Sequence, residues 1–283
     1  MITRRKFIPA AAGVVALGKL GAVGAQDASP VASPVVASID ELPLRNAGKL
    51  TVHADQPLYA PWFIDNDPTN GQGFESALTY KIAERLGFTA DQVEWGYTSF
   101  NASYAPGPKD FDFYITEVSI TETRAEAVDF SDPYYSSPLV LLAVDGSPLF
   151  EAQTLEDLKP YTFGAQVGTV YYTYIVEVIQ PDNDPLIFNT NSDAIQALAN
   201  GQTDADLQSL QIGQAIVTFQ FDNLGIVGLL PDGETNMGMV FEQGSELVPY
   251  VNLALQSLKD DGTLDALIAE WLPIPEELRE ISR

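Results

Sequence analysis

The chain has no cysteine and a single histidine, His53. Without cysteine it can form no disulfide bond, thiolate metal site or cysteine nucleophile. One histidine cannot supply a histidine-rich metal site or a pair of histidine bases. The commonest catalytic routes are therefore disfavoured, and we expect neither a metal nor a cofactor.

Basic residues are also scarce, with 14 Lys and Arg against 39 Asp and Glu, for a formal net charge of −25. Four of the bases, and no acid, lie in the first 25 residues, so the remainder carries −25 − 4 = −29. This deficit argues against nucleic acid as a partner, because proteins bind nucleic-acid phosphates mainly through Lys and Arg. We interpret the acidity as a well-solvated surface rather than as a binding feature.

The N-terminus reads "TRRKFIPAAAGVVALGKLGAVGA". A twin-arginine pair is followed by a core of apolar and small residues and by Val23-Gly24-Ala25, the kind of ending that signal peptidase cuts. Together they predict a signal peptide over residues 1–25, cleaved near Ala25. We therefore expect an exported protein, periplasmic or extracellular and associated with the cell surface. A retained membrane anchor is the alternative, but the apolar run from Ile8 to Leu17 is far shorter than the roughly 20 residues that span a bilayer.

A Ser, Pro, Ala and Val tract follows, and it predicts a flexible tether over residues 26–43. Periodicity then predicts alternating strands and helices. Strands are expected at 49–55, 92–97, 111–116, 139–144, 161–168, 185–190 and 237–245. Helices are expected at 73–88, 170–179 and 192–202, and two more lie within 246–272, separated at 260–263. This alternation favours α/β lobes with parallel sheets.

Arg124 is the only basic residue between Lys109 and Lys159, and it lies among carboxylates and hydroxyls in "FDFYITEVSITETRAEAVDFSDPYYSS". An arginine offers a planar fork of donors that matches a carboxylate, and it stays charged when partly buried. The segment therefore predicts a carboxylate-binding arginine. The structural alternative is a surface arginine that opens a helix beside Glu122 and Glu126.

The chain contains six short sequence motifs, in this order: "GFE", "SITETRAEAVDFSDPYY", "TLEDLK", "VGT", "DAIQALANGQTDAD" and "LKDDGTLDALIAEW". Over about residues 48–272, they resemble the extracellular solute-binding proteins of family 3, which feed polar amino acids to ABC importers. The resemblance implies a two-lobed fold of the type II periplasmic-binding-protein class, with two crossover strands as a hinge and a ligand held by cleft closure. The crossings would fall at 139–144 and 237–243. Lobe 1 would comprise 44–141 and 236–283, and lobe 2 would comprise 142–235.

The resemblance also implies how a ligand carboxylate would be held. In the family, the arginine that corresponds to Arg124 grips the α-carboxylate. Ser119 would add its hydroxyl and backbone N–H. Thr169 and the N–H of Val170 would contribute from a helix N-terminus, where free donors favour an anion. A turn serine and a plain helix cap are the structural alternatives for Ser119 and Thr169.

Four further contacts follow from the same resemblance. Asp55 corresponds to an acid that helps to bind the ligand's ammonium group. Either Tyr59 or Trp62, together with Phe100, corresponds to the aromatics that sandwich the ligand side chain. The loop "PLYAPW" carries one residue more than usual, which leaves the choice between Tyr59 and Trp62 open. Gln166 corresponds to a position that often contacts the ligand's side chain.

Two positions depart from the family pattern. Ser209 falls where the family's ammonium-clamping aspartate is expected, and a serine supplies no charge. Glu117 falls where glycine, serine, asparagine or glutamine is more typical. Either Glu117 has taken over the cation, or the ligand has a cationic side chain or is no standard amino acid. A solvated strand-end glutamate is the structural alternative.

These features predict a monomeric binding protein without catalysis, which delivers an amino acid or a similar zwitterion to an ABC transporter permease. The alternative is a periplasmic dehydratase-like enzyme on the same fold. That chemistry needs a general acid beside several cations that hold two carboxylates, and Arg124 is the one cation expected in the cleft. A sensor domain of a membrane receptor is disfavoured, because no later transmembrane segment is evident.

Overall fold

The computed structural model describes residues 38–273 and 278–283, which belong to one compact unit, Ser33–Arg283. The predicted signal peptide and most of the predicted tether lie outside the described residues. The last tether residues do not behave as predicted. Ile39–Glu41 forms a short 3-10 helix, and Leu42 is 7% exposed and packs in the core. An apolar side chain at that point anchors the segment to the folded protein.

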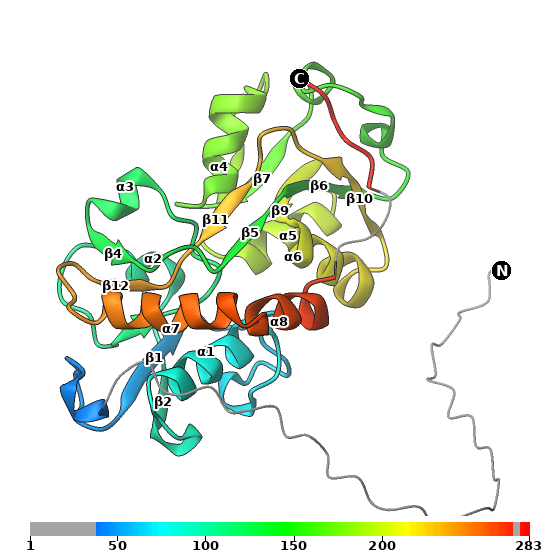
Figure 1. Ribbon diagram of the computed structural model, residues 1–283. Helices are drawn as coiled ribbons and strands as arrows, with labels where there is room; N and C mark the ends of the chain where they lie inside the picture. The colour runs from blue at the N-terminus through cyan, green and yellow to red at the C-terminus, as the bar shows by residue number, and fades with distance from the viewer. Residues whose placement is uncertain (1–37, 274–277) are drawn as a thin grey trace, which may run out of the picture. The chain divides into compact units, whose positions relative to one another are not determined.

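Two five-stranded sheets organise the described residues, and the first has the order β2-β1-β3-β12-β4. Strand β1 pairs in parallel with β2 and β3, and β12 returns antiparallel between β3 and β4. The strands are β1 Leu50–Ala54, β2 Val93–Tyr97, β3 Phe113–Tyr114, β4 Val128–Phe130 and β12 Val240–Glu242. Helices α1 (Phe74–Arg85), α7 (Val248–Asp260) and α8 (Thr263–Trp271) pack together beside it (Figure 1).

The second sheet has the order β10-β6-β9-β7-β8. Its strands are β6 Leu139–Val144, β7 Phe163–Gln166, β8 Leu186–Phe188, β9 Ala205–Ser209 and β10 Leu224–Leu229. The remaining helices are α2 Phe100–Ser103, α3 Glu122–Ala125, α4 Val170–Tyr174, α5 Asn191–Ala199 and α6 Leu210–Ala215. A π-helical turn continues α4 over Ile175–Ile179 and another continues α6 over Ile216–Gln220. The predicted strands and helices are thus confirmed, with small differences at their ends.

A third sheet of two antiparallel strands, β5 (Tyr135–Ser137) and β11 (Thr235–Met237), lies between the two larger sheets (Figure 1). The crossing strands were expected at 139–144 and 237–243. Residues 139–144 instead form β6 inside the second sheet, because this apolar run is buried on both faces. The hinge therefore lies a few residues earlier than the sequence predicts.

The C-terminal residues also differ from the prediction, which placed 236–283 wholly in lobe 1. Leu229 of β10 donates its N–H to the carbonyl of Arg279 at 2.8 Å, and Ile281 donates back to Leu229 at 2.9 Å. Ile281 is buried in the core of the second sheet. These last residues therefore belong structurally with lobe 2, because their backbone extends the edge at β10.

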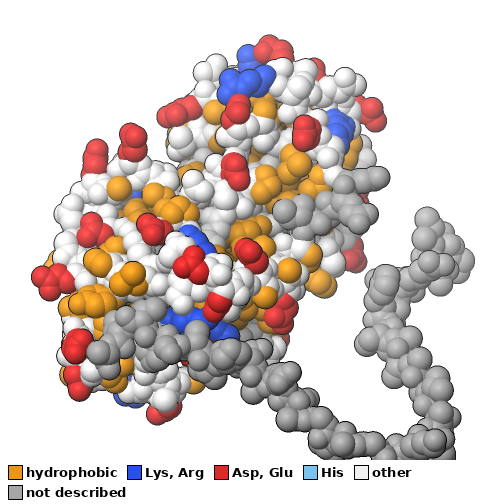
Figure 2. All heavy atoms as spheres, in the orientation of Figure 1, with side chains coloured by type: hydrophobic (Ala, Val, Ile, Leu, Met, Phe, Trp, Pro, Cys, Tyr) orange, Lys and Arg blue, Asp and Glu red, His pale blue; other side chains and the backbone are white. Residues whose placement is uncertain are grey.

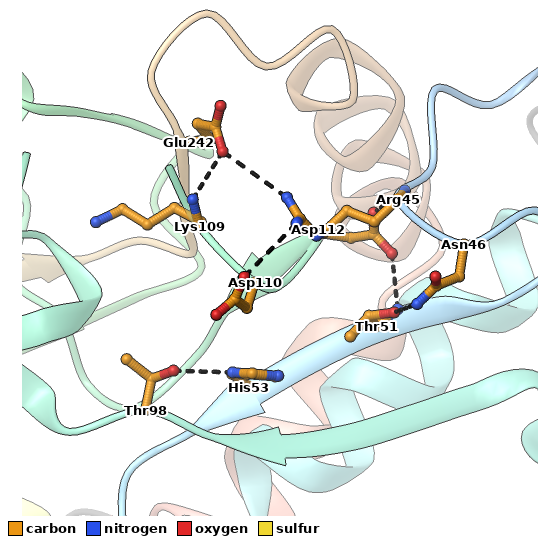
Figure 3. A network of polar contacts seen from close by, with 9 residues as sticks. All are labelled: Arg45, Asn46, Thr51, His53, Thr98, Lys109, Asp110, Asp112 and Glu242. Carbon is orange, nitrogen blue, oxygen red and sulfur yellow. Dashed lines mark hydrogen bonds and ion pairs between the residues drawn. The ribbon is translucent and has the colours of Figure 1, made fainter. Parts of the chain in front are cut away.

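A polar network fixes the start of β1 (Figure 3). The carboxylate of Asp112 accepts the backbone N–H groups of Arg45 at 2.8 Å and Thr51 at 2.7 Å, and Glu242 accepts the N–H of Lys109 at 2.7 Å. In the same view, the Nδ1 atom of His53 lies 2.8 Å from the Thr98 hydroxyl. The single histidine is therefore a packing and hydrogen-bonding residue of β1.

The acidic composition is a surface property. Figure 2 shows Asp and Glu side chains distributed over the visible face without gathering at one place. Across the described ranges, no helix has both the length and the apolar character to cross a membrane.

Candidate functional site

A cavity of about 70 Å³ lies between the lobes. Nine of the predicted site residues line it: Asp55, Tyr59, Phe100, Glu117, Ser119, Arg124, Gln166, Thr169 and Val170. Sequence reasoning missed six others: Pro57, Thr116, Tyr171, Asn191, Gln208 and Ile212. The cavity therefore brings together segments from both lobes that lie far apart in the sequence.

Hydrogen bonds cross the cleft around this cavity. The Tyr59 hydroxyl meets the Ser192 hydroxyl at one end. At the other end, Arg124 Nη2 and the Tyr104 hydroxyl both donate to the carbonyl of Gly168, at 3.0 and 3.1 Å. Small-molecule sites usually measure about 300–1,000 Å³, so the cavity as it stands is smaller than a typical ligand site.

A larger groove of about 1230 Å³ adjoins the cavity and shares Arg124, Thr169 and Val170 with it. The smaller cavity is the better candidate site despite its size. The acids Asp55 and Glu117 line it together with Arg124. Opposite charges separated across one enclosed space are what recognition of a zwitterion needs.

Arg124 lies in the short helix α3, where the Thr121 hydroxyl accepts the Arg124 backbone N–H at 3.2 Å. Its guanidinium carbon lies 4.3 Å from the ring centre of Tyr104 and 5.4 Å from that of Phe100. Nη1 donates to the carbonyl of Ser119 at 2.7 Å. Burial lowers the pKa of Arg124, but the group remains a cation. Aromatic rings and carbonyls thus hold this cation at the cavity wall.

Glu117 has a backbone φ of 48°, in the left-handed region that few non-glycine residues adopt. Its N–H donates to Glu75 Oε1 at 2.7 Å, and its Oε2 accepts the Ser209 hydroxyl across the cleft at 3.3 Å. Burial, reinforced by the nearby charge of Glu75, raises the pKa of Glu117 well above its usual range. The conformation explains why glycine or asparagine suits this position, and it turns the carboxyl into the cavity.

Glu75 lies behind Glu117, in the first turn of α1. Its Oε1 also accepts the Tyr134 hydroxyl, while its buried Oε2 has no partner among the described residues. Burial raises the pKa of Glu75 to about 7. Two carboxyl groups close together in a desolvated site disfavour the doubly charged state, so a cation beside Glu117 would favour ionisation.

Asp55 directly follows β1, and its N–H donates to the Thr116 hydroxyl at 3.0 Å. Its Oδ1 accepts the N–H of Gln56 at 2.8 Å. Burial raises the pKa of Asp55, although the backbone N–H groups of Gln56 and Phe100 oppose the effect. Asp55 is therefore a second half-buried acid in the cavity wall.

The residues of the two lobes that were expected to bind a carboxylate lie in or beside regular elements. Ser119 forms a β-bridge with Met237 of hinge strand β11, so its position is coupled to the hinge. Thr169 caps α4, accepting the Tyr172 N–H at 3.4 Å and donating to the carbonyl of Gln166 at 2.9 Å. Both the helix-cap role and the cavity position expected for Thr169 are thus present in one residue.

Two predicted site residues lie elsewhere. Trp62 is 1% exposed and packs edge-on against Phe74 and Tyr135, with ring centres 5.7 and 5.6 Å away. It belongs to the core because so large an apolar ring gains most from full burial, which leaves Tyr59 as the cavity aromatic. Ser209 is fully buried across the cleft from Glu117, where its N–H donates to the Tyr171 hydroxyl at 3.2 Å. Its hydroxyl is engaged by Glu117 rather than facing the ligand space.

Within residues 38–273 and 278–283, no three His, Asp or Glu side chains gather in a way that could hold a metal ion. The sequence over residues 50–274 matches the model of a known family, described as "Bacterial extracellular solute-binding proteins, family 3". The chain belongs to this solute-binding family.

Named members of the solute-binding family are similar over most of the chain. The L-cystine-binding protein TcyJ of Escherichia coli (strain K12) is 28% identical over 214 residues, which cover 75% of this chain and 79% of that protein. The arginine-binding extracellular protein ArtP of Bacillus subtilis (strain 168) is 26% identical over 218 residues, covering 75% and 82%.

Solved structures agree with this membership. An ancestral arginine-binding protein bound to arginine has a TM-score of 0.66 and 29% identity, over 80% of this chain and 99% of that one. The ancestral amino acid-binding protein AncCDT-1, described as a precursor of cyclohexadienyl dehydratase, has a TM-score of 0.66 and 27% identity, over 80% and 96%. The two-lobed type II fold expected from the sequence is thereby confirmed.

Proposed function

We propose that this solute-binding protein captures an α-amino acid in the cavity between its lobes and delivers it to the permease of an ABC importer. The observation that carries the proposal is the convergence of Arg124 with Glu117 and Asp55 on one closed cavity. The ligand's α-carboxylate would lie at Arg124, near the Ser119 N–H and the α4 N-terminus. Its ammonium, or a basic side chain, would lie toward Glu117 and Asp55.

The relatives support this ligand class. Those described above bind cystine or arginine by name, and a further one is the lysine/arginine/ornithine-binding periplasmic protein of Escherichia coli (strain K12), 27% identical over 225 residues. Two acids against one arginine in the cavity suit a ligand with at least one free cationic group. Delivery would be by a monomer, exported by a signal peptide over residues 1–25 that is cleaved near Ala25.

The same cavity favours binding over catalysis. A dehydratase acting on a cyclic diene acid would need several cations, and Arg124 is the only Lys, Arg or His among the described residues that line the cavity. Incubation with a prephenate-like acid should leave that acid unchanged, as judged by absorbance and chromatography. Formation of the dehydrated, decarboxylated product would replace the binding function with an enzymatic one.

The test of the binding function is calorimetric titration with the standard amino acids and cystine, applied to wild type and to Arg124→Ala. Loss of the charged partner of a buried carboxylate costs about 3 to 5 kcal/mol, which is roughly a hundredfold or more in affinity. Lys81→Ala removes an exposed cation from α1 and serves as the control. Arg124→Ala binding within threefold of wild type would remove Arg124 from the site.

A further inference from the structure

Asp206 is an acid that the recognition scheme above leaves without a role. It lies in the middle of β9 and is 1% exposed. Its Oδ1 accepts a hydrogen bond from Gln208 Nε2 at 2.6 Å, while its Oδ2 has no partner among the described residues. A buried carboxyl with one unpaired oxygen is costly, so its single strong contact with Gln208 is the feature to explain.

Gln208 lines the ligand cavity, and so does its partner Asn191 at the start of α5. The two amides form a reciprocal pair. Gln208 Nε2 donates to Asn191 Oδ1 at 2.8 Å, and Asn191 Nδ2 donates to Gln208 Oε1 at 3.2 Å. An amide nitrogen carries two hydrogens, and for Gln208 one is taken by Asp206 and the other by Asn191. Gln208 therefore has no donor left for a ligand.

The carbonyl oxygen of Gln208 does retain capacity, because it has two lone pairs and Asn191 occupies one. Gln166, another cavity residue, is less constrained. Its Nε2 donates one hydrogen to the carbonyl of Asn189 at 3.5 Å and keeps the second, so only Gln208 has both amide hydrogens engaged. Burial raises the pKa of Asp206 well above its usual range. Oδ1 is the oxygen that accepts from Gln208 Nε2, so this contact orients the Gln208 amide.

We propose that Asp206 is a positioning residue that holds the Gln208 amide with its oxygen toward the ligand. The protein would then prefer amino acids whose side chains end in an N–H donor over isosteric ones that end in an oxygen acceptor. This inference rests on the proposed amino acid binding. Beyond that binding, the inference names the class of ligand side chain that the site selects.

The experiment compares two near-isosteric ligand pairs, L-glutamine with L-glutamate and L-asparagine with L-aspartate, by calorimetry at one pH and salt concentration. For the pair that binds more tightly, wild type should prefer the donor-ended member at least tenfold. Asp206→Leu frees the Gln208 amide to turn over, so the preference should fall at least fivefold. Asp206→Asn keeps an acceptor oxygen and should stay within twofold of wild type. Asp55 and Glu117 also affect the preference within each ligand pair, but they are the same in every variant, so a change in the preference does not come from them.

Gln208→Met provides an independent variant that keeps the side-chain length but removes the carbonyl oxygen. It should lose the preference as Asp206→Leu does, and thermal melts of all variants separate this loss from a folding defect. An unchanged preference in Asp206→Leu or in Gln208→Met would overturn the inference while leaving amino acid binding intact. Equal loss in Asp206→Asn and Asp206→Leu would also overturn it. If no amino acid binds wild type at all, the proposed function fails, and this inference fails with it.

Discussion

Replacing Glu117 by glutamine tests the charge arrangement of the cavity most sharply. The amide fits the same space and keeps a contact with the Ser209 hydroxyl, but it removes the carboxylate. A hydrogen bond to a charged group contributes about 1.5 to 3 kcal/mol, which corresponds to about tenfold to a hundredfold in affinity. We therefore expect Glu117→Gln to bind the amino acid at least tenfold more weakly than wild type.

The pH dependence gives the same prediction a second measure. Burial, reinforced by the nearby charge of Glu75, raises the pKa of Glu117, so this carboxyl keeps its proton to higher pH than an exposed glutamate does. A bound cation favours the ionised form, so binding releases the proton and affinity rises with pH. For a single proton the rise is at most about tenfold per pH unit. Calorimetry at pH 6 and pH 8 should show this rise in wild type and its loss in Glu117→Gln.

Glu122→Gln is the matched control, because Glu122 is an exposed acid on the same segment. It should bind as wild type does at both pH values. If Glu117→Gln also binds as wild type does, while Ser209→Ala loses affinity, Glu117 does not bind the cationic group of the ligand. Ser209 itself would then contact the ligand.

Three further predictions follow from the same geometry. Ser209→Asp should weaken binding in calorimetry, because it places a carboxyl in a fully buried position against that of Glu117; unchanged affinity would contradict this. The pKa of Glu75 is raised from 4.5 to about 7, so its stabilising proton is fully bound below pH 4.5 and lost as pH rises through about 7. Thermal melts of the ligand-free protein should therefore show up to about 3 kcal/mol less stability at pH 8 than at pH 4.5, and Glu75→Gln should flatten that change; an unaltered slope would contradict it. Small-angle scattering should show a more compact particle with saturating ligand, and an unchanged radius would count against hinge closure.

Many elements and most of the cavity could be predicted from the sequence because their signals are local or carried by short motifs, but β9, α6 and β10 were not predicted. Helical spacing from Phe74 to Leu86 marks α1, and the motif around Arg124 places that residue at the cleft. The hinge was misplaced because a buried apolar strand such as 139–144 has the same composition whether it crosses between lobes or stays within a sheet. Pairing partners, which the sequence does not display, decide between the two.

The amide pair was missed for a related reason. Gln208 stands one residue before Ser209 and so was visible in the sequence, but the register of β9 decides which of the two faces the cavity. Asn191 reaches Gln208 only through folding across 17 residues. Likewise, Trp62 and Tyr59 are both aromatics of one loop, and only the packing of Phe74 and Tyr135 around Trp62 assigns it to the core.

Mass spectrometry of the small molecule that copurifies with the protein and is released on denaturation tests the central claim most directly. The account predicts an α-amino acid with a free carboxylate for Arg124 and a cationic group for Glu117 and Asp55. A sugar, an inorganic ion or a carboxylic acid without an amine in that position would contradict it.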